Sequence, residues 1–252
     1  MCFYYAIIKQ NPRKLVQNKV ITEKQLDLFQ DHYLINGFVN PVLPVIVANN
    51  ELRFFEWGLL PAYINHETDK QNFRTKYNTL NAKCETIFSS KMYRESALKR
   101  RCLVICSGFY EWREYKGKKF PYFITLKNDD VFVFGGIYNE YTEKETGEIT
   151  GSYSIITVPA NELMEKIHNT KKRMPLIINP ENALNWLNTG LSKGEIESFF
   201  TPIASDILKA HTIKKFIPSK VEEFENADLI AYYHYPELSE IIEKQGNLFD
   251  DA

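Results

Sequence analysis

Apolar residues occur in short runs over the first 160 positions of the chain, and turn-forming residues separate these runs. Residues 3–8 are aromatic and aliphatic, which predicts a buried strand at the very start. Such a strand would hold the N-terminus in the core and keep it from fraying. Residues 43–48 and 52–57 flank Asn49 and Asn50, and this pattern predicts a β-hairpin.

The middle of the chain is also rich in strand patterns. Residues 102–106 form a continuous apolar run, and Ser107-Gly108 breaks it before the apolar pattern resumes. Residues 122–126 and 131–138 predict a second hairpin around a polar turn at 128–130. Further strands are expected at residues 109–115, 153–158 and 175–178.

Helix signals are short and dispersed. Thr22 and Gln25 fit a capping box, and apolar residues follow at helical spacing as far as Tyr33. Residues 59–81 are irregular and polar, which predicts a long loop of the kind that is often functional. Further helices are expected to begin near Asn161, Asn179-Pro180 and Pro236.

The strands do not alternate regularly with helices, and the chain shows no internal repeat and no linker rich in proline, glycine or serine. We therefore predict an α+β fold with a mostly antiparallel, barrel-like sheet and peripheral short helices. A single domain is expected over residues 1–240, followed by a flexible polar tail at 241–252.

Composition narrows the class of protein. Basic and acidic residues number 31 and 32, so a DNA site must be a local patch and not a global positive field. The four cysteines lack zinc-ligand spacing and no nucleotide motif is visible, so we expect no metal and no cofactor. Neither a signal peptide nor an apolar run of membrane-spanning length occurs. We expect a cytoplasmic protein with reduced thiols and no membrane partner.

Cys2 becomes the first residue of the chain if Met1 is removed. Its α-amine, with a pKa of about 8, and its thiol, with a pKa of about 8.5, then lie on adjacent carbons. Together they can condense with one aldehyde, first as a Schiff base and then as a five-membered thiazolidine. The dipeptide by itself is a weak signal, because every chain starts with an initiator methionine.

Three polar residues could support such chemistry. Asn81 either donates a hydrogen bond to a carbonyl or oxyanion, or caps a helix. Glu111 lies among aromatic residues; an inward carboxyl would have a raised pKa and donate protons near neutral pH, whereas an outward one would be an ordinary surface group. His168 precedes a basic run and is either a functional histidine or a satisfied interior one.

Basic residues gather in three segments, at residues 91–101, 116–119 and 171–173. Each segment is either a solvated face or a phosphate-binding patch. Trp57 and Tyr63 could offer stacking surfaces to bases.

Five short motifs occur in a fixed order. They are Met1-Cys2, Trp-Gly-Leu-Leu-Pro from Trp57, Asn-Ala-Lys-Cys-Glu-Thr from Asn81, the run 101–112 that ends in Gly-Phe-Tyr-Glu-Trp, and His168 followed by Arg-Met-Pro from Arg173. Together they resemble the SRAP family (SOS response-associated peptidase), whose members crosslink to abasic sites in single-stranded DNA. The resemblance runs from residue 1 to about residue 187.

The resemblance implies an enzyme of the DNA damage response. The Cys2 amine would attack the aldehyde of the ring-opened sugar, and its thiol would close the thiazolidine. Asn81 would position the amine or the sugar, Glu111 would be the acid/base, and His168 would protonate the sugar oxygen. Peptidase removal of its own Met1 and a β-elimination (lyase) step would accompany this chemistry.

The resemblance also implies DNA contacts, and here the chain departs from the family pattern. The family start is usually Cys-Gly-Arg, whereas Tyr4 stands here in place of the arginine. Lys83 replaces an arginine and lacks its bidentate fork. Residues 170–172 are an insert that adds two positive charges. The residues matched to DNA-contacting positions are Trp57, Lys83, Arg94, Thr157 and Arg173.

Two other functions are compatible with the same residues. A cysteine peptidase would use Cys2 as nucleophile, His168 as base and Asn81 in the oxyanion site. A non-covalent module for single-stranded or modified DNA would use Trp57 and the basic loops.

The tail carries a separate motif. Gln245, Leu248 and Phe249 fit the Gln-x-x-Leu-Phe form of peptides that dock on bacterial sliding clamps. An apolar anchor pair on a flexible end suits such docking, and the motif predicts the clamp as a partner.

Overall fold

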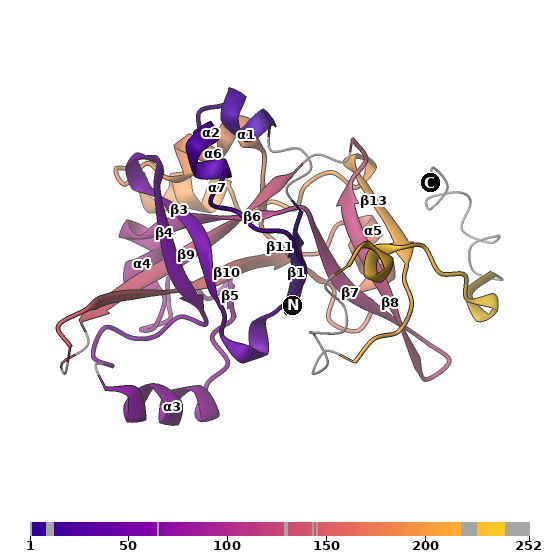
Figure 1. Cartoon of the computed structure of the whole chain (residues 1–252), viewed down its shortest axis with the longest axis horizontal. Coiled ribbons are helices and arrows are strands. Elements are labelled where there is room, and N and C mark those ends of the chain that lie inside the picture. Colours follow the sequence, from indigo (N-terminus) through magenta and orange to yellow (C-terminus); the bar gives the residue numbers. More distant parts are fainter. Residues whose placement is uncertain are drawn as a thin grey trace.

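The computed structural model describes residues 2–8, 13–64, 66–128, 131–142, 144, 146–217 and 226–239. Two β-sheets form its centre, and short helices lie around them (Figure 1). The helices are α1 (Arg13–Gln17), α2 (Glu23–Leu26), α3 (Glu67–Lys76), α4 (Arg94–Lys99), α5 (Glu162–Ile167), α6 (Pro180–Trp186) and α7 (Lys193–Ser198), with 3-10 turns η1 (Gly37–Val39), η2 (Ala48–Asn50), η3 (Ser205–Ile207) and η5 (Ala227–Ile230).

The smaller sheet holds the start of the chain between two other strands. Its strand order is β13 (Leu208–Thr212), β8 (Lys118–Leu126), β7 (Gly108–Tyr115), β1 (Tyr4–Ile7) and β2 (His32–Asn36). Strand β1 pairs antiparallel with both neighbours, and Tyr5 lies opposite Ile35 on one side and Phe109 on the other. The predicted N-terminal strand is therefore confirmed, and it is hydrogen-bonded on both edges.

The larger sheet closes on itself. Strands β10 (Ile149–Pro159), β4 (Glu51–Trp57), β3 (Val42–Val47), β6 (Arg101–Cys106) and β9 (Phe132–Thr142) pair in turn, and β9 pairs again with β10. Only the β10–β4 pairing in this ring is parallel. The short strands β5 (Asn81–Lys83) and β11 (Arg173–Pro175) pair with β10, and β12 (Ile177–Ile178) pairs with β9. The α+β prediction with a mostly antiparallel barrel is confirmed.

Aromatic side chains fill the space between the two sheets. Trp57 is fully buried and its ring stacks on Tyr153 at 6.3 Å between centroids. The hydroxyl groups of Tyr5 and Tyr153 lie 3.1 Å apart, so β1 and β10 are joined by a polar contact inside an apolar core. The indole nitrogen of Trp57 donates to the Leu80 carbonyl at 2.9 Å, which satisfies its only polar group.

Several local predictions are confirmed. Thr22 and Gln25 form a capping box, and the Asn161 side chain accepts from the Met164 amide at 2.9 Å at the start of α5. Strands β3 and β4 form the predicted hairpin, whose turn residues Asn49 and Asn50 have φ of 59° and 58°. Asparagine tolerates this left-handed region better than most residues.

Three local predictions are wrong. Helix α2 ends at Leu26, and Tyr33 lies in β2, because pairing with β1 outweighs the local helical spacing. Residues 59–81 are not a continuous loop but contain α3. Strands β8 and β9 do not form a hairpin, because β8 pairs with β7 and β13 while β9 belongs to the barrel. The chain therefore passes from one sheet to the other at this turn.

Some predictions concern parts of the chain beyond the described residues. Residues 236–239 are helical, as expected after Pro236, but the tail at 241–252 and its Gln-x-x-Leu-Phe motif lie outside the described residues. Within the described part of the chain, no helix has the length and apolar character needed to span a membrane.

Arg101 ties two helices to the barrel. Its guanidinium is buried and donates to the carbonyls of Ala97 at 2.9 Å, Leu98 at 2.7 Å and Trp186 at 2.9 Å, and also to that of Asn188. These oxygens lie in the C-terminal part of α4, at the last residue of α6 and just beyond it. The sequence placed Arg101 in a basic patch, but its side chain is structural.

We expect Arg101→Met to lower the free energy of unfolding by about 3 kcal/mol, because four carbonyls, two of them in fully buried hydrogen bonds, lose their donor while the apolar packing is kept. Urea denaturation measures the change. The exposed Arg53, which pairs with Glu51 at 2.8 Å, is the matched control, and Arg53→Met should cost under about 0.5 kcal/mol. Equal losses for the two variants would contradict the structural role of Arg101.

Candidate active site around Cys2

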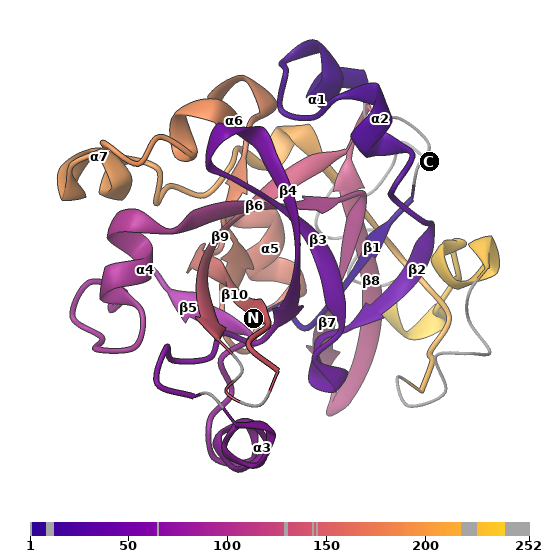
Figure 2. The same ribbon diagram turned by 60° about the vertical axis from the view of Figure 1, so that its left-hand side comes forward.

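Cys2 lies two residues before the start of β1 and is completely buried. Its thiol contacts the Tyr4 carbonyl at 3.5 Å, and its own carbonyl accepts a hydrogen bond from Asn81 Nδ2 at 2.8 Å. The first strand and this side-chain contact fix the position of the residue that would become N-terminal if Met1 were removed. Figure 2 shows the start of the chain between the barrel strands and β7.

Asn81 reaches Cys2 from the other sheet. It begins β5, where it pairs with Ile155 of β10 in parallel register, so the helix-cap interpretation is wrong. Its side-chain oxygen Oδ1 is buried and has no hydrogen-bond partner among the described residues. A buried carbonyl oxygen of this kind is an acceptor for an amine or hydroxyl group that enters the site.

Glu111 points into the protein from β7 and is 4 % exposed. Burial raises the pKa of its carboxyl to about 7, because the charged form loses its hydration. The carboxyl is therefore close to half-protonated at neutral pH and can both give and take a proton. Of the two orientations that the sequence allowed, the structure has the inward one.

His168 follows α5 as its C-terminal cap and is 8 % exposed. Its Nδ1 lies 2.9 Å from the Arg173 carbonyl and 3.7 Å from Glu111 Oε1. Burial lowers the pKa of the imidazole to about 4, so the ring is neutral at pH 7. In that state Nδ1–H donates to the Arg173 carbonyl. The histidine is thus both a satisfied interior residue and a neighbour of the carboxyl.

The thiol belongs to the same electrostatic group. Burial raises the pKa of the Cys2 thiol far above its ordinary value, and the Glu111 carboxylate raises it further. The thiol is consequently protonated at neutral pH. Cys2, Asn81, Glu111 and His168, which are spread over 167 positions of the sequence, are brought together at the junction of the two sheets.

Thr157 and Arg173 lie together beside this group. Thr157 is fully buried in β10, and Arg173 donates to its carbonyl at 2.6 Å and to its hydroxyl at 3.1 Å. Arg173 also pairs with Glu85. Its positive charge is therefore partly neutralised within the protein, a contact that sequence reasoning missed although Glu85 lies within the motif that starts at Asn81.

The remaining predicted DNA contacts differ in accessibility. Lys83 is exposed at the end of β5 and pairs in register with Thr157, next to the site. Arg94 is exposed in the first turn of α4, and no interaction among the described residues connects it with Cys2. Trp57 is buried in the core, so it offers no face to a base, whereas Tyr63 is 72 % exposed.

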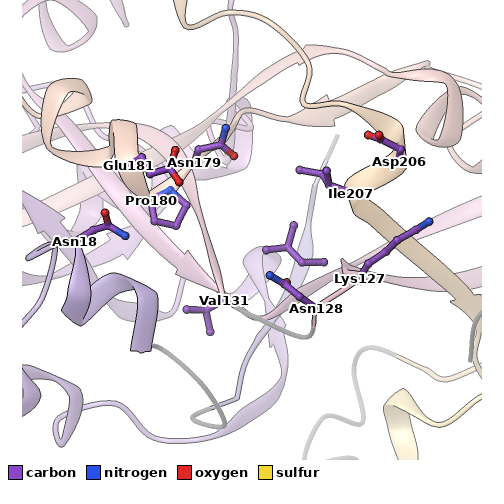
Figure 3. A pocket seen from close by; sticks show the side chains of 10 residues that line it. Asn18, Lys127, Asn128, Val131, Asn179, Pro180, Glu181, Asp206 and Ile207 are labelled. Carbon is purple, nitrogen blue, oxygen red and sulfur yellow. The ribbon is translucent and has the colours of Figure 1, made fainter.

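Two cavities lie away from the Cys2 group. One of about 490 Å³ opens between the end of β8 and the start of α6 (Figure 3), and a second of about 410 Å³ adjoins it through Asn179 and Ile207. None of the predicted site residues lines either cavity. Among the described residues, no cluster of histidine, cysteine or acidic side chains has the arrangement of a metal site.

The model of the family described as SOS response associated peptidase (SRAP) matches residues 1–220. The chain belongs to the SRAP family. The Cys2 group of this SRAP protein lies entirely inside the matched region. Among the relatives, it is 32 % identical over 174 residues to the abasic site processing protein YoqW of Bacillus subtilis, covering 68 % of this chain and 73 % of YoqW.

More distant relatives are found in eukaryotes. The SRAP protein is 29 % identical over 158 residues to the abasic site processing protein HMCES of Xenopus tropicalis, covering 55 % of this chain and 45 % of HMCES. A crystal structure of a Bacteroides thetaiotaomicron protein superimposes with a TM-score of 0.79 at 32 % identity, covering 92 % of this chain and all of that one.

Proposed function

We propose that this chain processes abasic sites in single-stranded DNA by attaching itself covalently to them through Cys2, after Met1 has been removed. The carrying observation is that Cys2 is held by Asn81 at 2.8 Å beside a carboxyl whose pKa is about 7. Relatives named abasic site processing proteins support the substrate. The product would shield the lesion during the DNA damage response.

Glu111 and His168 would open the sugar ring. At neutral pH the imidazole is neutral and about half of the Glu111 carboxyls are ionised, so a carboxylate base is present. The free nitrogen of His168 is Nε2, because Nδ1–H donates to the Arg173 carbonyl. A proton taken up from solvent at Nε2 would make His168 the acid for the ring oxygen, while the Glu111 carboxylate takes the proton of the C1′ hydroxyl and His168 returns to its neutral form. The bond between C1′ and the ring oxygen breaks, and a free aldehyde results.

The Cys2 amine then adds to the aldehyde and gives a carbinolamine. Protonated Glu111 donates to the carbinolamine hydroxyl, which leaves as water, and an iminium ion forms. Asn81 Oδ1, which is buried and has no hydrogen-bond partner among the described residues, would accept a hydrogen bond from the reacting amine or hydroxyl. The iminium stage also allows β-elimination at the sugar, which would be the accompanying lyase activity.

The thiol closes the ring in the last step. Its sulfur adds to the iminium carbon, the carbon–nitrogen π electrons return to nitrogen, and the thiol proton passes to the Glu111 carboxylate. The carboxyl regains the proton that it gave in the previous step, so one water is the only by-product. A carboxyl with a pKa of about 7 suits both directions of transfer at cell pH.

The structure favours this chemistry over a general cysteine peptidase. A cysteine protease lowers the pKa of its thiol to obtain a thiolate, whereas burial raises that of Cys2. Addition to an iminium ion needs no preformed thiolate, because the carboxylate takes the proton as the bond forms. Removal of Met1 by the protein itself remains part of the proposal as a single intramolecular event.

A crosslinking assay tests the proposal. Protein whose intact mass shows that Met1 is absent is mixed with single-stranded DNA containing one abasic site, then denatured and weighed. The expected adduct has the summed mass of the two molecules less one water. DNA whose abasic aldehyde has been reduced to the alcohol is the control and should give none. Absence of the adduct with the unreduced DNA would overturn the proposal.

Asn81→Ala should slow adduct formation about 10- to 100-fold, because the Cys2 carbonyl loses its anchor and the reacting atoms lose their alignment. Single-turnover kinetics on abasic DNA measure the rate. Asn139→Ala is the matched control. The buried Asn139 side chain donates an equivalent hydrogen bond of 3.0 Å to the Leu60 carbonyl, but it does not contact Cys2 through that bond. Equal rate losses for both variants would show a general effect on stability.

The sliding clamp is proposed as a partner of the tail through Gln245, Leu248 and Phe249. Deletion of residues 245–252 should leave crosslinking to free single-stranded DNA unchanged and abolish any shift in binding caused by added clamp. A clamp-dependent shift that survives the deletion would remove this partner from the proposal.

A further inference from the structure

The segment between α5 and β11 is held in place from both sides. The Lys172 amide donates to the His168 carbonyl at 2.8 Å, and the Lys172 carbonyl accepts from the Ala160 amide at 3.1 Å. Asn169 clamps the segment to β7, because its side chain accepts from the Glu114 amide at 3.0 Å and donates to the Glu114 carbonyl at 2.8 Å. This loop of residues 169–172 is therefore fixed by hydrogen bonds to its neighbours.

The two lysines of this loop have different surroundings. Lys172 has a φ of 50°, and its ammonium turns back along α5 to Glu165 at 3.7 Å. Lys171 is exposed and forms no ion pair with any described residue. Its charge acts on His168, where it is one of the causes that lower the pKa of the imidazole. Lys171 thus adds positive potential on the histidine side of the Cys2 group.

Lys83 lies on the β5 side of the group, and Arg173, the other nearby cation, is less available. Arg173 is engaged by Glu85 and Thr157, and its side chain is 13 % exposed. Tyr4 leaves the start of β1 without a basic residue. An uncompensated ammonium three residues from His168 therefore lies where an anionic group next to the bound sugar would need a partner.

We propose that Lys171, presented by the rigid loop of residues 169–172, binds a phosphodiester group directly flanking the abasic nucleotide, whereas Lys172 serves only to fold the loop. The inference rests on the proposed function for the place of the sugar, and it adds a phosphate subsite on the His168 side. Lysine suits this task as a point charge on a flexible stem.

Non-covalent binding provides the test. Cys2→Ala protein is titrated with single-stranded DNA that carries a tetrahydrofuran abasic analogue, which has no aldehyde, over a range of salt concentrations. Lys171→Asn should weaken binding about 5-fold at low salt and reduce the slope of log K against log salt by about 0.7. Lys172→Asn is the matched control, since asparagine tolerates the positive φ, and it should change affinity less than 2-fold.

A methylphosphonate placed at each flanking phosphate in turn identifies the contact. At one of the two positions, removal of the charge should weaken binding of the parent protein and have little further effect on Lys171→Asn. The subsite would be overturned if the two lysine variants weakened DNA binding equally. It would also be overturned if the loss of affinity from Lys171→Asn simply added to the loss from the methylphosphonate at each of the two positions. Failure of crosslinking to true abasic DNA would instead overturn the proposed function, because the analogue assay needs no chemistry.

Discussion

Replacement of Cys2 by alanine should abolish the adduct that survives denaturation while leaving a Schiff base that borohydride can trap. The alanine retains the α-amine, so the iminium ion still forms, but no sulfur is present to close the ring. The expected loss of stable adduct is complete, since no other described cysteine is held at the start of the chain. Gel analysis with and without borohydride separates the two species.

The half-buried Cys84 provides the control for this prediction. Cys84→Ala keeps both nucleophiles of residue 2 and should crosslink at the rate of the parent protein. A denaturation-stable adduct with Cys2→Ala would show that sulfur is not part of the linkage. Absence of the trapped species would show that the amine is not the first nucleophile.

Replacement of Glu111 by glutamine should stabilise the fold at high pH and slow the chemistry. Burial raises the pKa of this carboxyl from 4.5 to about 7, so its contribution to stability is complete below about pH 4.5 and is lost as pH rises through 7. At pH 8 the parent protein keeps a buried charge that the amide lacks. Glu111→Gln should then be more stable by about 3 kcal/mol, with little difference at pH 4.

Urea denaturation at the two pH values, together with the rate of adduct formation, measures both effects. The crosslinking rate at pH 7 should fall by about 10²-fold, because glutamine cannot exchange a proton with the carbinolamine or the thiol. Glu114→Gln, an exposed change on the same strand, should alter neither quantity. A variant that is stabilised at pH 4 as much as at pH 8 would contradict the raised pKa.

The sequence predicts the parts of the site that depend on local pattern. The apolar run at residues 3–8 locates β1, and the aromatic surroundings of Glu111 raise the prospect of an inward carboxyl. Asn81 is different, because its position is set by parallel pairing with Ile155, which lies 74 positions further along the chain. Local pattern favours a helix cap there, and only the tertiary structure shows the contact with Cys2.

The sequence contains a pattern that predicts a buried Trp57, but the family motif was given more weight. Trp57 lies two positions after Phe55 on the same face of β4, and both side chains are buried. This period of two predicts an interior tryptophan. The family motif instead led to an expected DNA contact. The prediction of a β8–β9 hairpin is wrong for another reason. Two consecutive strands joined by a short polar turn can belong to different sheets when each pairs with other strands.

If the proposed crosslink through Cys2 forms, the double pairing of β1 has a mechanical consequence. Tension on the nucleic acid would pull along the axis of β1, against its hydrogen bonds to β2 and β7 at the same time. Such a load acts in shear on the hydrogen bonds at both edges of β1 together and does not open them one at a time. A polymerase or helicase that pulls on the linked strand would therefore have to break the pairing of β1 in the smaller sheet before the N-terminus could move.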